Sequence, residues 1–165
     1  MSATQILPNF QVIEILSGNG PAEIYSLAHG KIKVIDFWTT KCDKCPAALS
    51  KLDDLAPLHG NAAFFSCVLQ KDVQDQEVAK DVIDGSWENM IHLFVDIATK
   101  EELKATFNFK EVPFCVIVGE DHRILASGNP KDINIEEVLR RGGALLEVPP
   151  TAIEASGRLV LDEDF

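Results

Sequence analysis

Two cysteines in the stretch VIDFWTTKCDKCPAAL, residues 34–49, are separated by only two residues. Two thiols at the spacing of Cys42 and Cys45 can act as a redox couple, supply half of a tetrahedral zinc site, or pack as neighbouring core residues. A zinc site needs two further ligands. Cys67 and Cys115 are isolated, and the four histidines form no ligand-spaced pair. The pattern therefore favours a redox couple, and no metal site is expected.

The surroundings expected for the pair favour an ionised thiol. Cys42 would end a strand-to-helix turn, and Cys45 would lie in the first helical turn, where the following Pro46 is tolerated. The unpaired amides and partial positive charge of a helix N-terminus stabilise a thiolate, and Lys41 and Lys44 add positive charge. We therefore expect Cys42 to be the nucleophile and Cys45 to be the thiol that resolves the mixed disulfide.

Strands and helices alternate along the sequence around this pair. Apolar, β-branched and aromatic runs predict strands at residues 10–16, 32–38, 62–69, 91–96, 114–118 and 124–127. Helical spacing predicts helices at 46–59, 75–89, 99–107 and 134–146. The third helix would begin with a capping box from Thr99 and Glu102, and the last would be interrupted or ended at Gly142-Gly143. This order predicts an α/β fold, and a late hairpin around the turn GEDHR makes its sheet mixed.

The overall composition is that of an ordinary folded protein. With 165 residues, 46% of them apolar and 25% charged, the chain fits one domain over residues 1–147 and an acidic tail at 148–165 that we expect to be flexible. The net charge of −11 argues against nucleic acid or an anionic membrane as a partner. The N-terminus lacks the basic start and long apolar stretch of a secretory signal, so a cytoplasmic location is expected.

The run DFW, followed after three residues by CxxC, resembles the active-site strand and turn of the thioredoxin family. Asp36 and Trp38 lie six and four residues before Cys42, where thioredoxins carry a buried aspartate and a tryptophan. The segment EVP at residues 111–113 is similar to the cis-proline loop of that family. The resemblance covers roughly residues 10–143. It implies a thioredoxin-like fold, with a central mixed sheet flanked by helices.

The sequence also departs from a minimal thioredoxin. An extra strand and helix precede the proline loop, and an N-terminal extension is present. This layout is more similar to tryparedoxins, nucleoredoxins and bacterial cytochrome-maturation reductases. Lys41 replaces the tryptophan usual before the first cysteine, and Asp43-Lys44 replaces the usual Gly-Pro pair. The docking surface and the reduction potential of thioredoxin therefore do not carry over to this chain.

The resemblance implies a role for each candidate residue. Asp36 would be the base that deprotonates Cys45, directly or through water, although a strand residue bonded to a backbone amide is the alternative. Pro113, if cis, would expose the backbone of Val112 to an extended substrate, and an ordinary trans proline is the alternative. The residues expected to contact the substrate are Trp38, Lys41, Asp43, Lys44, Val112 and Pro113.

These expectations predict a protein-disulfide reductase. Its partners would be disulfide-containing client proteins and an upstream donor, either a flavoprotein reductase or a low-molecular-weight thiol. No cofactor is expected, because the sequence has no GxGxxG or P-loop pattern. Two alternatives are a thiol peroxidase and a redox-inert adaptor. Thr39 suits the peroxidase pattern, whereas Ile35 stands where that pattern has proline.

Overall fold

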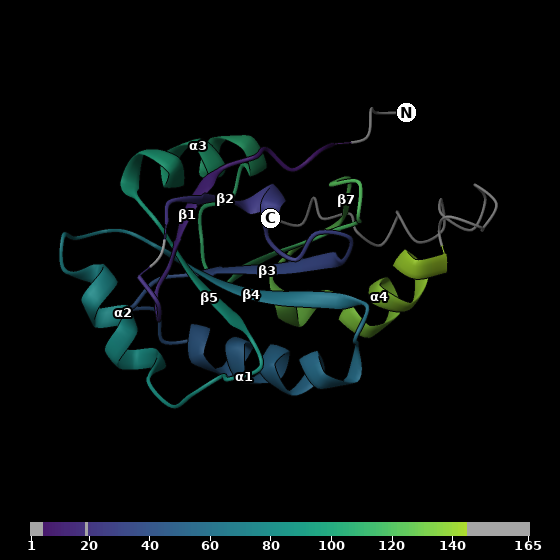
Figure 1. The fold of residues 1–165 in the computed structure, drawn as a ribbon, viewed down its shortest axis with the longest axis horizontal. Coiled ribbons are helices and arrows are strands. Elements are labelled where there is room, and N and C mark those ends of the chain that lie inside the picture. The colour runs from purple at the N-terminus through teal and green to yellow at the C-terminus, as the bar shows by residue number, and fades with distance from the viewer. Residues whose placement is uncertain (1–4, 19, 145–165) are drawn as a thin grey trace.

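The computed structural model describes residues 5–18 and 20–144, and its centre is a seven-stranded mixed sheet (Figure 1). The strands are β1 Gln11–Glu14, β2 Ala22–Glu23, β3 Ile32–Trp38, β4 Ala62–Leu69, β5 Ile91–Val95, β6 Phe114–Val118 and β7 Ile124–Gly128. The helices are α1 Cys45–Leu55, α2 Asp75–Ile83, α3 Ile97–Phe107 and α4 Ile135–Ala144, with the short 3-10 helices η1 Ile24–Ser26, η2 Ala56–Leu58 and η3 Pro130–Asp132. The tail expected at 148–165 lies outside the described residues.

The strands are arranged in the order β2-β1-β5-β4-β3-β6-β7. The central strands β3, β4 and β5 pair in parallel, whereas β6, β7 and β1 add antiparallel pairings, which confirms the predicted mixed sheet. All seven residues of β3 are buried, which explains the nearly continuous apolar character of its sequence. Two strand–helix units, β4–α2 and β5–α3, lie between α1 and β6, as the resemblance implied.

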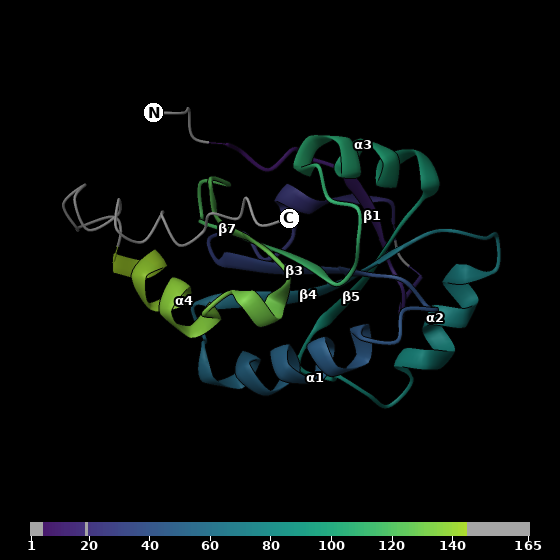
Figure 2. The same cartoon turned by 180° about the vertical axis from the view of Figure 1, so that it is seen from behind.

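Helices cover both faces of the sheet, and Figures 1 and 2 show α1 and α3 on opposite sides of it. Even-numbered residues of β3, such as Trp38, pack in one apolar cluster with residues of α1, α2 and α4. Odd-numbered residues, such as Phe37, pack in a second cluster with Leu103 of α3 and the N-terminal segment. Because successive strand side chains point to opposite faces, Asp36 points into the layer that contains α1.

Both edges of the sheet offer little free backbone. The edge strand β2 has only two residues. At the other edge, the chain near the N-terminus covers the start of β7, where the amide of Ile124 donates to the carbonyl of Gln5 at 2.9 Å. Beside it, the amide of Leu7 donates to the carbonyl of His122, also at 2.9 Å.

Two predicted helix boundaries are wrong. Helix α2 ends at Ile83 rather than at residue 89, because Gly85 and Trp87 adopt left-handed backbone angles, with φ of +74° and +50°. Helix α3 begins at Ile97, and the side chain of Asp96 accepts a hydrogen bond from the amide of Thr99 at 2.9 Å. The cap is therefore Asp96 and not the predicted box from Thr99 and Glu102.

Two further expectations are corrected by the structure. The first predicted strand, 10–16, is confined to Gln11–Glu14, and β2 with η1 was not predicted. Helix α4 continues through Gly142. A Cβ at Gly142 would lie 2.9 Å from Ile32 Cδ1, so the missing side chain lets α4 pack closely on β3.

Among residues 5–18 and 20–144, no helix is long and apolar enough to cross a membrane.

Candidate active site

The cysteine pair lies where β3 leads into α1. Cys42 and Cys45 form a disulfide, with Cα atoms 5.5 Å apart. Cys45 is the first residue of α1 and is fully buried, whereas Cys42 precedes the helix and is half-buried. An incoming thiol or disulfide can therefore reach the sulfur of Cys42 and not that of Cys45. This asymmetry supports the predicted roles of Cys42 as nucleophile and Cys45 as resolving thiol.

The N-terminus of α1 provides positive potential beside Cys42. The helix begins after Lys44, which makes no side-chain capping hydrogen bond, and Pro46 occupies its first turn. The first amides of a helix have no acceptor within the helix, and the helix dipole adds partial positive charge. Positive potential of this kind favours the thiolate form of a cysteine over the thiol.

Asp36 lies in the same buried layer as Cys45. Its side chain is fully buried, on the sheet face that also carries Val34 and Trp38 and that α1 covers. Within the described part of the chain, neither carboxyl oxygen of Asp36 has a hydrogen-bond partner. Burial raises the pKa of Asp36 well above the ordinary carboxyl range. A carboxylate whose pKa is raised in this way is a stronger base than an exposed one, which is what a proton acceptor for Cys45 needs.

The proline loop packs against the disulfide. The peptide bond between Val112 and Pro113 is cis, as the sequence comparison with thioredoxins predicted. Cys42 Sγ lies 3.7 Å from the carbonyl oxygen of Val112. The proline ring is buried, whereas Val112 is half-buried. The backbone of Val112 therefore borders the reactive sulfur directly.

A groove of about 510 Å³ runs between α1 and the segment after β7. It is lined by Asp43, Lys44, Ala47, Ala48, Lys51, Pro113, Asn129, Pro130 and Lys131. Lys51 Nζ donates a hydrogen bond to the carbonyl of Pro130 at 3.1 Å and so joins the two walls. Three lysines against one aspartate give this groove a positive lining in a chain whose net charge is −11. Asp43 and Lys44, predicted to contact substrate, lie in its lining.

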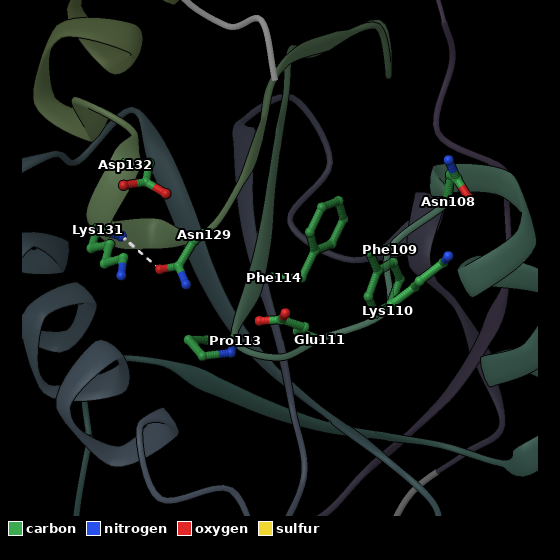
Figure 3. A pocket seen from close by; sticks show the side chains of 9 residues that line it. All are labelled: Asn108, Phe109, Lys110, Glu111, Pro113, Phe114, Asn129, Lys131 and Asp132. Carbon is green, nitrogen blue, oxygen red and sulfur yellow. Dashed lines mark hydrogen bonds between the residues drawn. The ribbon is translucent and has the colours of Figure 1, made fainter. Parts of the chain in front are cut away.

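A second cavity of about 390 Å³ continues on the other side of Pro113 (Figure 3). Asn129 and Lys131 line one wall, Phe109 and Lys110 line the other, and Pro113 lies between them. The Asn129 side chain accepts a hydrogen bond from the Lys131 amide at 3.0 Å. Neither residue was predicted as part of the site, because the sequence gives no sign that the turn after β7 reaches the proline loop.

Two residues predicted to contact substrate lie away from both cavities. Trp38 is buried and packs edge-on against Trp87, with ring centroids 6.2 Å apart. Lys41 is exposed and forms an ion pair with Asp72 at 3.7 Å, on the side of the β4–α2 connection. The structure thus places Trp38 beneath the cysteine turn and Lys41 on its outer surface.

Asp75 fixes the connection between β4 and α2 next to the cysteine turn. Its Oδ2 accepts hydrogen bonds from the amides of Lys71 and Asp72 at 2.6 and 2.7 Å, and its Oδ1 accepts one from Thr40 Oγ1 at 3.4 Å. Burial alone would raise the pKa of Asp75, but these hydrogen bonds outweigh it and the pKa lies below the ordinary value. The ionised form of Asp75 is therefore part of the folded structure.

We expect Asp75→Asn to lower the free energy of unfolding by about 2 kcal/mol at pH 7, because charge-assisted hydrogen bonds are lost. A lowered folded pKa contributes stability above the unfolded carboxyl pKa, and this contribution disappears as the pH falls through the folded pKa. Urea unfolding at pH 7 and pH 3 measures the difference, with the exposed Asp81→Asn on the same helix as control. An equal loss at both pH values would contradict the assignment.

No group of three or more His, Cys, Asp or Glu side chains within residues 5–18 and 20–144 could hold a metal ion. The other two cysteines, Cys67 and Cys115, are buried and free. Burial raises the pKa of both thiols, and the charge of Asp36 raises it further. These two thiols are therefore poor nucleophiles, which leaves Cys42 as the reactive thiol of the described structure.

Several solved structures are similar to this chain in fold. The thioredoxin domain of a thiol-disulfide oxidoreductase from Bacteroides vulgatus has a TM-score of 0.63 at 18% identity, covering 77% of this chain and 89% of that one. A thiol:disulfide interchange protein from Bacteroides sp. has a TM-score of 0.66 at 14% identity, with 85% and 91% covered. A secreted Mycobacterium tuberculosis disulfide oxidoreductase homologous to E. coli DsbE has a TM-score of 0.60 at 22% identity, with 82% and 96% covered.

A comparison with curated protein sequences finds no match. A family model described as thioredoxin-like matches residues 30–124, which is more than half of the chain. The matched region contains β3, the CxxC turn, α1 and the loop that ends at Pro113. The chain therefore belongs to the thioredoxin-like family.

Proposed function

We propose that this protein is a protein-disulfide reductase. The observation that carries the proposal is the arrangement of a half-buried Cys42 and a fully buried Cys45 in a disulfide at the start of α1, in the layer that also holds Asp36. One sulfur is open to a client, the other is protected, and a buried carboxyl group is available to exchange a proton with the protected one. These three features suit the two steps of thiol–disulfide exchange, the attack on a client and the resolution of the mixed disulfide.

The reaction proceeds in two exchanges. The Cys42 thiolate attacks one sulfur of a client disulfide, a mixed disulfide forms, and the first client thiolate leaves and takes a proton from solvent. Asp36 then accepts the proton of the Cys45 thiol, and the resulting thiolate attacks Cys42 Sγ. The second client thiolate leaves, and the protein is oxidised by two electrons. A thiol or a flavoprotein reductase returns those two electrons.

The direction of the reaction depends on the reduction potential of the Cys42–Cys45 pair relative to that of its client. The reductase proposal requires the potential of this pair to be the lower of the two, so that the pair gives up electrons to the client disulfide. The proposal includes a cytoplasmic location, where client disulfides are exposed to a reducing pool.

The test is insulin reduction with dithiothreitol as donor, combined with equilibration of the Cys42–Cys45 pair in glutathione buffers. We expect insulin to precipitate faster than with dithiothreitol alone. We also expect the pair to stay largely oxidised in buffers that reduce a control oxidase of the periplasmic type. Absence of catalysis, or a pair that is reduced as easily as such an oxidase, would overturn the reductase assignment.

A further inference from the structure

Four buried polar side chains form a row across the sheet, in the layer that faces α1. Asp36 on β3 is matched in register by Cys115 on β6 and by Ser66 on β4, and Ser66 is matched by His92 on β5. Their side chains are 0% exposed except that of His92, which is 3% exposed. Adjacent strands lie about 4.8 Å apart, so the side chains at matched positions on one face are neighbours.

The hydrogen bonds of His92 determine where its protons lie. His92 Nε2 is 2.8 Å from the carbonyl oxygen of Trp87, which can only accept, so Nε2 carries a proton and donates it. Burial lowers the pKa of His92, which keeps the ring neutral near pH 7. In a neutral ring the other nitrogen, Nδ1, is an acceptor. Ser66 Oγ lies 2.6 Å from Nδ1 and therefore donates its hydroxyl proton to it.

The single hydroxyl proton of Ser66 is thus committed to His92 and is not available to Asp36. Ser66 is the hydroxyl residue matched to Asp36 in the sheet, yet both carboxyl oxygens lack a hydrogen-bond partner within residues 5–18 and 20–144. A hydroxyl that donated to the carboxylate would stabilise its ionised form. Withholding that donor leaves the ionised carboxylate unstabilised and makes it a stronger base toward Cys45.

We propose that Ser66 and His92 are positioning residues for Asp36. His92 holds the Ser66 hydroxyl proton away from the Asp36 carboxyl group and so preserves the strength of Asp36 as a base. This inference rests on the proposed function and explains two residues that the reductase mechanism does not otherwise use. His92 acts through Ser66, and neither touches the reacting sulfurs.

Other titratable groups face the same row. Cys45 and Lys51 approach from α1, Asp53 of α1 lies on the His92 side, and Cys115 of β6 belongs to the row itself, whereas Cys67 of β4 points to the opposite face of the sheet. In the oxidised protein Cys45 does not titrate, and the raised pKa values keep both free thiols neutral. The oxidised protein therefore isolates the coupling between Asp36 and His92.

The test is the pH titration of the Asp36 carboxyl carbon by ¹³C NMR in the oxidised protein. In His92→Phe the Ser66 hydroxyl loses its acceptor and becomes free to donate to Asp36. We expect the acid dissociation constant of Asp36 to rise about tenfold. In His92→Gln the amide oxygen still accepts from Ser66 and the amide nitrogen still donates to Trp87, so we expect the constant to stay at the wild-type value. Equal constants in all three proteins would overturn the proposal.

The Ser66→Ala variants separate positioning from simple structural support. Adding Ser66→Ala to His92→Phe removes the released donor, and we expect it to reverse the tenfold rise. Ser66→Ala alone is expected to leave the acid dissociation constant of Asp36 unchanged. Because it is a small change, it keeps the proposal testable if His92→Phe does not fold. A tenfold fall in the dissociation constant of Asp36 in Ser66→Ala would show that Ser66 already donates to it, and would overturn the proposal.

The same variants give a kinetic measurement. The acid limb of the pH profile for resolution of the mixed disulfide should move to lower pH in His92→Phe and return in the double variant. The NMR titration uses no client and does not depend on turnover. Failure of insulin reduction by the wild type would therefore overturn the proposed function alone, whereas an unchanged Asp36 titration would overturn this inference alone.

Discussion

Cys42→Ser is expected to abolish catalysed insulin reduction, leaving the rate at the level of dithiothreitol alone. The half-buried Cys42 sulfur is the one that a client can reach, and a serine hydroxyl does not attack disulfides at neutral pH. Cys45→Ser is expected to behave differently, because Cys42 can still attack. The variant should accumulate a stable mixed disulfide between Cys42 and its client, since no resolving thiol remains.

Turbidity of insulin measures the turnover, and mass spectrometry of the non-reduced protein measures the mixed disulfide. Cys67→Ala is the matched control, because Cys67 is buried in the cluster on the other face of the sheet. It should leave the rate unchanged. Full turnover by Cys45→Ser would contradict the two-cysteine mechanism, and residual catalysis by Cys42→Ser would contradict the choice of nucleophile.

Asp36→Asn is expected to make the oxidised protein more stable at neutral pH and also a slower enzyme. Burial raises the pKa of Asp36 in the folded state, whereas in the unfolded chain it is an ordinary carboxyl group. Between the two pKa values the folded protein binds one proton more than the unfolded chain. Its stability therefore falls as the pH rises, by about 1.4 kcal/mol for each pH unit.

Asparagine has the shape of the protonated carboxyl group and does not titrate. The stability advantage of Asp36→Asn over the wild type should therefore grow from its value at pH 4 as the pH increases, and level off above the folded pKa of Asp36. Urea unfolding of both oxidised proteins at pH 4, 5.5 and 7 measures this. Parallel stability curves would show that Asp36 does not titrate between the folded and unfolded states.

The same substitution removes the base that serves Cys45. We expect resolution of the mixed disulfide to slow by about a hundredfold, the usual contribution of a general base. The reaction of Cys42 with its first client should change much less, because that thiolate is supported by the start of α1. A gain in stability with a loss of rate is the expected signature of a strained catalytic group.

Two local features of the site were predicted from neighbouring residues and are present in the structure, the CxxC pair at the start of a helix and the cis bond before Pro113. The CxxC pair and its helix lie within a few residues of one another, and each has a local physical cause. Proline 113 was recognised from the three residues EVP and the strand that follows. The two wrong boundaries are the end of α2 and the start of α3. They depend on which residue adopts left-handed backbone angles and which side chain caps the helix. Several neighbouring residues could have done either.

The features that the sequence did not reveal depend on distant parts of the chain. Asn129 and Lys131 join the site only because β7 pairs with β6 beside the proline loop. Ser66 and His92 are 26 positions apart and meet only through the register of β4 with β5. In the sequence Ser66 is one polar residue in an apolar strand, and nothing local connects it to Asp36. Such pairs follow from strand register, which single-sequence patterns do not determine.

The short or covered edges of the sheet have a consequence for the proposed reductase function, in which clients are partly unfolded. A client whose disulfide is accessible often exposes extended backbone as well, and an open sheet edge would invite that backbone to add as a further strand and grow into an aggregate. Here one edge ends in the two-residue β2, and the other is occupied at its start by residues 5–7. The architecture thus lets foreign chains approach the cysteines while giving them little surface on which to polymerise.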